Sequence, residues 1–233
     1  MPRHIGMLIF PRLTQLDMTG PYEVLARLPD TTVDLVARTL DPVKTDRGMQ
    51  ILPTVTYAGC PPLDVVMVPG GPGQQDLMED EEALAFLRRQ AASVKFITSV
   101  CTGSLVLGAA GLLEGKRATC HWAAIEHLAL LGAIPVRERV VVDGNVVTGA
   151  GVASGIDFAL ELAAILDGEA VAREIQLQIE YDPDPPFDSG SPATAAPETV
   201  AALRARLAKL SAERRTVAAR VGRRLGVAPA ANE

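Results

Sequence analysis

Short apolar runs alternate with longer segments of helical periodicity along most of the chain. Four runs have the length and composition of buried strands: 6–10, 33–37, 64–68 and the run that ends just before Cys101. Helical patterns occupy the segments between and after them: 17–28, 77–91, 156–166 and 170–180. This alternation predicts an α/β fold in which helices cover both faces of a mostly parallel sheet.

Two shorter segments depart from the alternation. Residues 43–53 are polar and β-like around Gly48, which predicts a small excursion from the sheet. Valine-rich strands at 140–142 and 145–147 flank Asp143-Gly144, a dipeptide typical of tight hairpin turns. We therefore expect one antiparallel hairpin beside the parallel strands.

The composition of the chain changes after residue 181. Residues 1–181 carry the α/β pattern and are expected to form one domain, and the Pro-, Ser- and Ala-rich residues 182–197 an extended connector. The tail, 198–233, contains a helix predicted over 198–225, with eight Lys and Arg against two Glu. Its leucines have helical spacing, which favours packing on the domain or on a second subunit. No aromatic residues interleave its charges, which argues against a nucleic-acid tail.

Composition, net charge and cysteine spacing exclude several classes of protein. The 233 residues are 48% hydrophobic but only 4% aromatic, so a sizeable aliphatic core is expected. A net charge of −6 argues against nucleic acid as a partner. No long apolar run predicts a membrane span, and the N-terminus lacks a signal-peptide pattern. The three cysteines have no metal-ligand spacing. We expect a cytoplasmic protein with neither metal nor organic cofactor.

Cys101 is the first candidate for chemistry. It stands where an apolar strand gives way to a helix, and the small residues Ser99 and Gly103 leave room for a sharp turn, as in a nucleophile elbow. Amides at the start of the following helix favour thiolate over thiol. Cys120 ends a strand and is expected to be structural, and Cys60 lies in a loop beside Pro61-Pro62 with no obvious partner.

A reactive thiol needs an acid or base and a place to hold developing charge. Gly70 and Gly71 follow the strand at 64–68, so their amides and that of Thr102 are expected at the same carboxyl edge of the sheet as Cys101. Asp17 returns to this edge after the first strand. Glu23 and His121 remain alternatives for the acid or base.

Several motifs, in order, resemble the PfpI-like, class I glutamine amidotransferase-like superfamily. They are Leu16-Asp17-Met18-Thr19-Gly20-Pro21-Tyr22-Glu23, Val68-Pro69-Gly70-Gly71, Ser99-Val100-Cys101-Thr102-Gly103, Ala118-Thr119-Cys120-His121-Trp122 and Thr148-Gly149-Ala150-Gly151. The resemblance covers residues 4–181 and makes 1–181 a catalytic domain of this type. It implies a flavodoxin-like three-layer α/β/α sandwich with a mostly parallel central sheet and a nucleophile elbow, plus a C-terminal helix.

Within the superfamily, the motifs are most similar to those of the isonitrile hydratases, also called isocyanide hydratases. Sensor domains of AraC-like regulators share many of them, but those proteins continue with two helix-turn-helix units, and here about 35 residues follow the connector. In the peptidase, glyoxalase and deglycase branch an acidic residue, commonly Glu, pairs with the cysteine. This chain has Asp17 at the best-matching position, which favours the hydratases.

The hydratase resemblance implies lyase chemistry, in which an isonitrile, R–N≡C, and water give an N-substituted formamide through a thioimidate on Cys101. It implies Asp17 as general acid and then base, with Thr102 orienting the acid or donating to the intermediate. Gly70 and Gly71 would line the polar pocket. Ala150 would lie near the helix that carries Cys101, where its small size leaves room for that helix to shift. Relatives of this type are generally homodimers.

Overall fold

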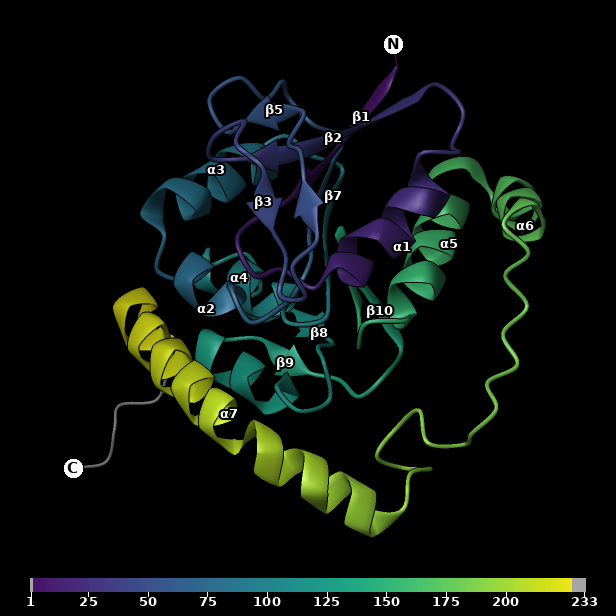
Figure 1. Ribbon diagram of the computed structural model, residues 1–233. Coiled ribbons are helices and arrows are strands. Elements are labelled where there is room, and N and C mark those ends of the chain that lie inside the picture. The colour runs from purple at the N-terminus through teal and green to yellow at the C-terminus, as the bar shows by residue number, and fades with distance from the viewer. Residues whose placement is uncertain (1, 228–233) are drawn as a thin grey trace.

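The computed structural model describes residues 2–227 and has a central sheet between two layers of helices (Figure 1). The strands of the sheet are β1 (Arg3–Leu8), β2 (Thr31–Ala37), β5 (Val55–Thr56), β6 (Val65–Val68), β7 (Phe96–Val100), β10 (Val140–Asp143) and β11 (Val146–Gly149). Their order is β10-β11-β7-β6-β1-β2-β5. Only the β10–β11 pair is antiparallel, so the carboxyl ends of all the strands except β10 meet at one edge.

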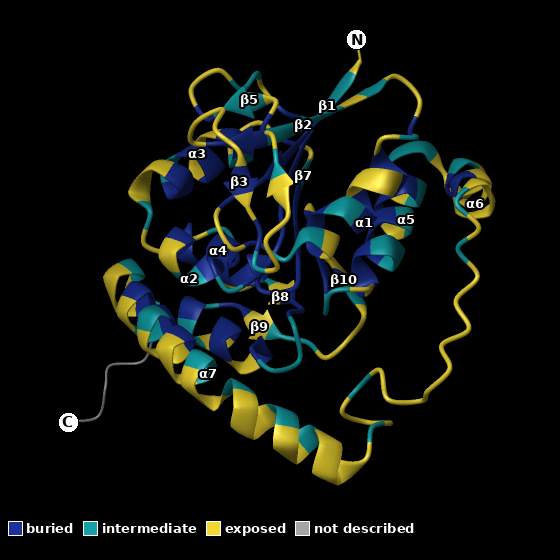
Figure 2. Ribbon diagram, in the orientation of Figure 1, coloured by how far each residue is buried: buried dark blue, intermediate teal, exposed yellow. Residues whose placement is uncertain are grey.

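Helices cover both faces of this sheet (Figure 1). One face carries α1 (Gln15–Leu25) and α5 (Ser154–Asp167), with α6 (Glu169–Gln178) packed on α5, and the other carries α2 (Gln74–Leu77), α3 (Glu81–Ala91) and α4 (Gly103–Ala109). Every residue of β6 and β11 is buried, which explains the continuous apolar sequence of β6. Buried residues line the sheet and the inner faces of the helices (Figure 2). The predicted flavodoxin-like three-layer fold is confirmed.

The short elements are mostly where the sequence predicted them. Residues 43–53 contain the antiparallel pair β3 (Val43–Lys44) and β4 (Gln50–Ile51), outside the main sheet. Asp143 pairs with Val146 across the predicted hairpin turn. A second small pair, β8 (Arg117–Ala118) and β9 (Ile134–Pro135), flanks the 3-10 helix η1 (Ile125–Leu131).

The helix predicted over 77–91 is present as α3 and begins at Glu81, because the region after β6 is divided between α3 and a separate short helix, α2. Asp80 causes the division: its carboxylate accepts hydrogen bonds from the amides of Glu82 and Ala83, at 3.1 and 3.3 Å. A side-chain cap of this kind starts a new helix. The earlier helix, α2, places Gln74 directly after the glycine loop that follows β6.

The C-terminal helix α7 (Pro197–Leu225) packs on η1 and α4. Arg214, Ala218 and Val221 are buried, and the leucine stripe of its first half is partly buried. Of the two predicted alternatives, the stripe therefore packs on the chain's own domain. The part of the predicted tail at 228–233 lies outside the described residues. None of the helices within 2–227 is long and apolar enough to cross a membrane.

Candidate active site

Cys101 directly follows β7 and adopts a left-handed backbone conformation, with φ of 60°. Its amide donates a hydrogen bond to the Gly149 carbonyl at 3.0 Å, which ties the turn to β11. A Cβ at Gly103 would lie 2.0 Å from the Val68 carbonyl oxygen, so only glycine permits this close approach. The strand, sharp turn and helix form the predicted nucleophile elbow.

Asp17 reaches the same site from the first turn of α1. The side chain is fully buried, and its Oδ2 accepts a hydrogen bond from the Gly70 amide at 2.9 Å. Oδ1 is buried and has no partner with hydrogen-bond geometry among residues 2–227. The Cys101 thiol lies close enough that each group shifts the pKa of the other. The structure thus brings together the predicted nucleophile and the predicted acid.

Burial dominates the protonation of this pair. It raises the pKa of Asp17 from 3.8 to about 7, against the lowering effects of Cys101 and of the Gly70 hydrogen bond. Burial also raises the pKa of Cys101 well above its ordinary value, and the charges of Asp17 and Cys120 raise it further. The hydrogen bond from the Thr102 amide opposes this rise. Asp17 is therefore a proton acceptor near neutral pH, positioned beside a protonated thiol.

The expectation that the helix start alone favours thiolate is wrong for this site. The helix after the turn, α4, has only seven residues, and the favourable amide contact comes from Thr102. A short helix has a weak macrodipole field, whereas full burial penalises the charged form strongly.

Gly70 and Gly71 hold the other polar groups of the site in place. The Gly71 amide donates to Thr102 Oγ1 at 3.1 Å, just as the Gly70 amide donates to Asp17. A Cβ at Gly70 would lie 2.6 Å from the Thr102 nitrogen, and one at Gly71 2.4 Å from the Thr14 nitrogen. The glycines thus let the loop contact Thr102 and Asp17 directly. Their binding of an intermediate stays a prediction.

The remaining predicted residues differ in their relation to the thiol. Ala150 follows β11 one residue after Gly149 and donates its amide to the Arg139 carbonyl at 2.9 Å. His121 lies beside Gly151, and burial lowers its pKa to about 4, so it is neutral at pH 7. Glu23 is exposed on α1 and pairs with Arg27 at 2.5 Å. Asp17 alone of the three acid–base candidates is shown to perturb the thiol.

Sequence reasoning missed Arg214 as a component of this region. The residue lies on α7 and is 7% exposed, and its Nε donates to Gln74 Oε1 at 3.0 Å. A signal was present, because Arg214 shares the spacing of Leu210, Val217 and Val221 on the packed face of the helix. An arginine on the packed face of a helix indicates that a polar group in the protein interior contacts it.

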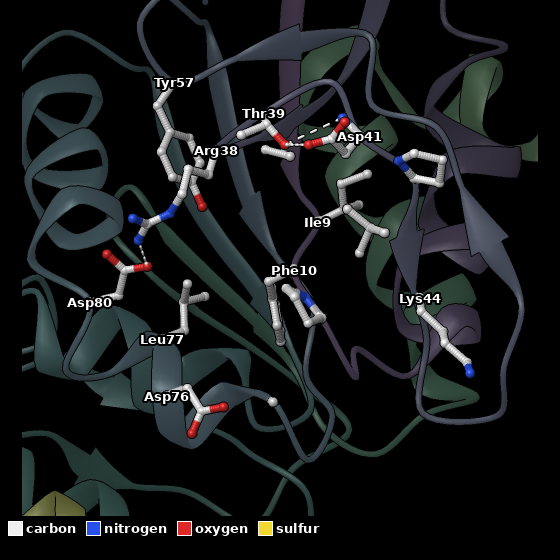
Figure 3. Close-up of a pocket in the computed structure, with 15 residues that line it drawn as sticks. Ile9, Phe10, Arg38, Thr39, Asp41, Lys44, Tyr57, Asp76, Leu77 and Asp80 are labelled. Carbon is white, nitrogen blue, oxygen red and sulfur yellow. Dashed lines mark hydrogen bonds and ion pairs between the residues drawn. The ribbon is translucent and has the colours of Figure 1, made fainter.

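A separate cavity of about 490 Å³ opens at the carboxyl ends of β1 and β2 (Figure 3). Its apolar wall includes Ile9, Phe10 and Leu77, and Arg38 at its rim is paired with Asp80. Cys101 and Asp17 do not line it. Within residues 2–227, no cluster of three or more His, Cys, Asp or Glu side chains is arranged to hold a metal ion.

Comparisons with known proteins identify the family of the chain. Residues 3–165 match the DJ-1/PfpI family. The chain is 59% identical to an isonitrile hydratase of Pseudomonas putida over 208 residues, which cover 89% of this chain and 91% of that protein. It is 31% identical over 130 residues to the glutathione-independent glyoxalase DJR-1.2 of Caenorhabditis elegans, covering 55% of this chain and 69% of that protein. A crystal structure of a THiJ/PfpI family protein from Pseudomonas syringae superposes with a TM-score of 0.92 at 44% identity, covering 94% of this chain and 91% of that chain.

Proposed function

The chain belongs to the DJ-1/PfpI family, and from this premise we propose that it is an isonitrile hydratase. Such an enzyme converts an isonitrile, R–N≡C, and water to an N-substituted formamide. The observation that carries the proposal is the 59% identity to the Pseudomonas putida hydratase over nearly the full length of both proteins. The buried pair of Cys101 and Asp17 supports it, because this reaction needs a nucleophile and a mobile proton.

In the first step, Cys101 sulfur attacks the terminal carbon of the isonitrile. The thiol proton passes to Asp17, whose pKa of about 7 suits it to accept and return a proton near neutral pH. The attacked carbon gains electron density, and the proton on Asp17 moves to that carbon. The product is a thioimidate, Cys–S–CH=N–R, in which the S–H bond is lost and S–C and C–H bonds are formed.

In the second step, water adds to the thioimidate carbon. Asp17, again ionised, takes a proton from the water and passes it to the nitrogen, which gives a tetrahedral S–CH(OH)–NHR adduct. Collapse of this adduct forms the C=O bond, breaks the S–C bond and releases the formamide, while the hydroxyl proton passes through Asp17 to the thiolate. Soft sulfur is a good nucleophile in the first step and a good leaving group in the second.

The surrounding residues hold this pair in the geometry that the reaction needs. Thr102, fixed by the Gly71 amide, orients the acid, and Gly70 fixes the carboxyl oxygen through its own amide. Ala150 leaves space beside the Cys101 turn. The glycine loop thus holds Asp17 and Thr102 in position. The isonitrile carbon enters between the Cys101 thiol and Asp17.

We also assign a homodimer and a reducing cytosol to this protein as parts of the proposal. Several large apolar side chains are exposed and would be covered by a second copy: Leu16, Leu40, Met49 and Leu52. All three cysteines are free thiols, which suits a compartment that keeps Cys101 reduced. Sedimentation of the purified protein at its working concentration tests whether it is a homodimer.

A formamide assay tests the function. The purified protein is mixed with an alkyl or aryl isonitrile, beside the Cys101→Ala and Asp17→Asn variants and with a dicarbonyl as a competing substrate. We expect formamide from the parent and none above background from either variant. Absence of formamide from the folded parent rejects the hydratase, and dicarbonyl turnover without isonitrile turnover assigns the chain to the chemistry of its glyoxalase relative.

A further inference from the structure

Arg214 is a buried cation that the proposed reaction has not used. It is 7% exposed on the packed face of α7, near the middle of a helix whose other arginines and lysine are exposed. Within residues 2–227 it forms no ion pair with a carboxylate. Burying a guanidinium without a carboxylate partner is costly, so its position requires a reason.

The guanidinium is held by Gln74, and the helix that carries it is tied to η1. Gln74 Oε1 accepts its Nε–H at 3.0 Å, and Gln74 is itself fully buried, with its Nε2 on the Met78 sulfur. Gln74 lies three residues after Gly71, so the arginine is anchored to the loop that holds Thr102 and Asp17. One turn earlier on α7, Ser211 Oγ lies 3.3 Å from His127 Nε2, which ties the same helix to η1.

The charged and titratable groups around this position are few. Cys101, Cys120, His121 and His127 all interact electrostatically with Arg214: the two thiols raise its pKa, and it lowers the pKa of both histidines. On the other side of the thiol, the facing acid is Asp17, which in turn faces Asp46. Arg214 is therefore a buried permanent cation whose pKa the Cys101 and Cys120 thiols raise, while burial and Asp17 have the largest effects on the Cys101 thiol itself.

We propose that Arg214 is a positioning residue of the active site, a fixed positive charge delivered by the C-terminal helix that stabilises the thiolate of Cys101. The proposal rests on Cys101 as the proposed nucleophile. When the sulfur loses its proton to Asp17 or leaves the tetrahedral adduct, it is negative in a site where burial opposes negative charge. A guanidinium held by Gln74 stabilises that charge without reorganisation. It also explains why a helix outside the three-layer core packs against η1 and α4.

The test is the pH dependence of Cys101 alkylation by iodoacetamide, followed by mass spectrometry of the peptide that contains Cys101. Only the thiolate reacts, so at a pH below the thiol's pKa the rate reports the thiolate fraction. No isonitrile is involved, so this experiment can fail while the formamide assay succeeds, and the reverse. The variants are Arg214→Gln and Arg214→Lys. The matched control is Arg220→Gln, which removes an exposed arginine of the same helix that pairs with Glu79.

We expect Arg214→Gln to lower the alkylation rate about tenfold at each pH below the thiol's pKa. Arg214→Lys should recover most of the rate, and Arg220→Gln should match the parent. The tenfold effect should persist in an Asp17→Asn background, because the charge acts directly on the sulfur. An unchanged rate in folded Arg214→Gln, or an equal loss in Arg220→Gln, overturns the proposal.

A second variant covers the case in which Arg214→Gln does not fold. Gln74→Glu keeps an acceptor for the Arg214 Nε–H but places a carboxylate beside the guanidinium and neutralises it. The expected result is again slower alkylation of Cys101, with melting temperature close to that of the parent. Alkylation at the parental rate or faster in Gln74→Glu contradicts the role given to Arg214.

Discussion

Asp17 Oδ2 accepts a hydrogen bond from the Gly70 amide at 2.9 Å, and a Cβ added at Gly70 would lie 2.8 Å from that same oxygen. Gly70, which holds the Asp17 carboxyl group, therefore cannot be replaced by a residue with a side chain without a steric clash. The other oxygen, Oδ1, is buried and has no partner with hydrogen-bond geometry within residues 2–227, and the Cys101 thiol is close enough to the carboxyl group to lower its pKa. The carboxyl group is fixed on one side, and its second oxygen is available for proton transfer.

Gly70→Ala should abolish most activity because the new methyl group pushes Asp17 and Thr102 away from the thiol. The added Cβ would also meet Thr102 Oγ1 at 2.7 Å. We expect kcat/KM to fall at least a hundredfold and the free energy of unfolding to fall by about 1–3 kcal/mol, as in overpacked cores. Steady-state kinetics and thermal unfolding measure the two effects. Gly190→Ala, at a glycine with no atom within 4 Å, should match the parent in both.

Asp17→Asn should stabilise the protein, and the gain should depend on pH. The folded-state pKa of Asp17 is about 7 against 3.8 ordinarily, so between these values the native state retains a proton that the unfolded state loses. Stability contributed by the protonated carboxyl is complete below about pH 4 and is lost as pH rises to 7. Asparagine keeps the acceptor for Gly70 and has no charge to bury. The difference in unfolding free energy between variant and parent should therefore grow by up to about 4 kcal/mol.

Chemical denaturation at pH 4, 5.5, 7 and 8 measures this difference. Asp188→Asn, a change at an exposed residue of the connector, serves as the control and should show a constant difference across the series. A constant difference for Asp17→Asn as well would mean that its carboxyl titrates in the same range when folded and unfolded.

The hydratase rate should decline on the acid side of neutrality. Asp17 must be ionised to accept the thiol proton, and its pKa is about 7, whereas the thiol remains protonated because its own pKa is raised. Below pH 7 we expect kcat/KM to fall about tenfold per pH unit. Initial rates of formamide formation between pH 5 and 8 measure the profile. An acid limb near pH 4, as for an ordinary carboxyl group, would disagree with the buried pair.

An alanine variant is usually more stable than a glycine variant at the same position, and the left-handed backbone at Cys101 should reverse this order. A φ of 60° is strained for a residue with a Cβ and is readily adopted by glycine. Cys101→Gly should be as stable as Cys101→Ala or more stable by about 1 kcal/mol, although glycine loses more backbone entropy on folding. Thermal unfolding of the two inactive variants compares them directly. A clearly more stable alanine variant would mean that the turn carries no strain.

Much of this architecture could be predicted because its signals are local. Fully buried strands such as β6 appear as unbroken apolar runs, and the elbow is marked by a cysteine between a strand and small residues. The protonation of Cys101 could not be read in this way. The direction in which its pKa shifts depends on how completely the tertiary structure excludes water. The local helix start suggested a lowered pKa, whereas burial raises it.

The division of the region after β6 and the role of the tail also depend on information beyond periodicity. Asp80 separates α2 from α3 through two side-chain hydrogen bonds, which an apolar pattern does not reveal. Arg214 has the spacing of the packed face of α7, but its partner Gln74 is 140 residues away in sequence. Contacts of this kind become visible only when the chain is folded.

The most direct test of the covalent account is the intact mass of the protein during turnover. The parent is mixed with excess isonitrile, quenched in acid within milliseconds to seconds and analysed by mass spectrometry, with the adduct located by peptide mapping. The account predicts an added mass equal to one isonitrile on Cys101, which appears before formamide accumulates and is absent from Cys101→Ser. Formamide production that continues in Cys101→Ser would contradict it.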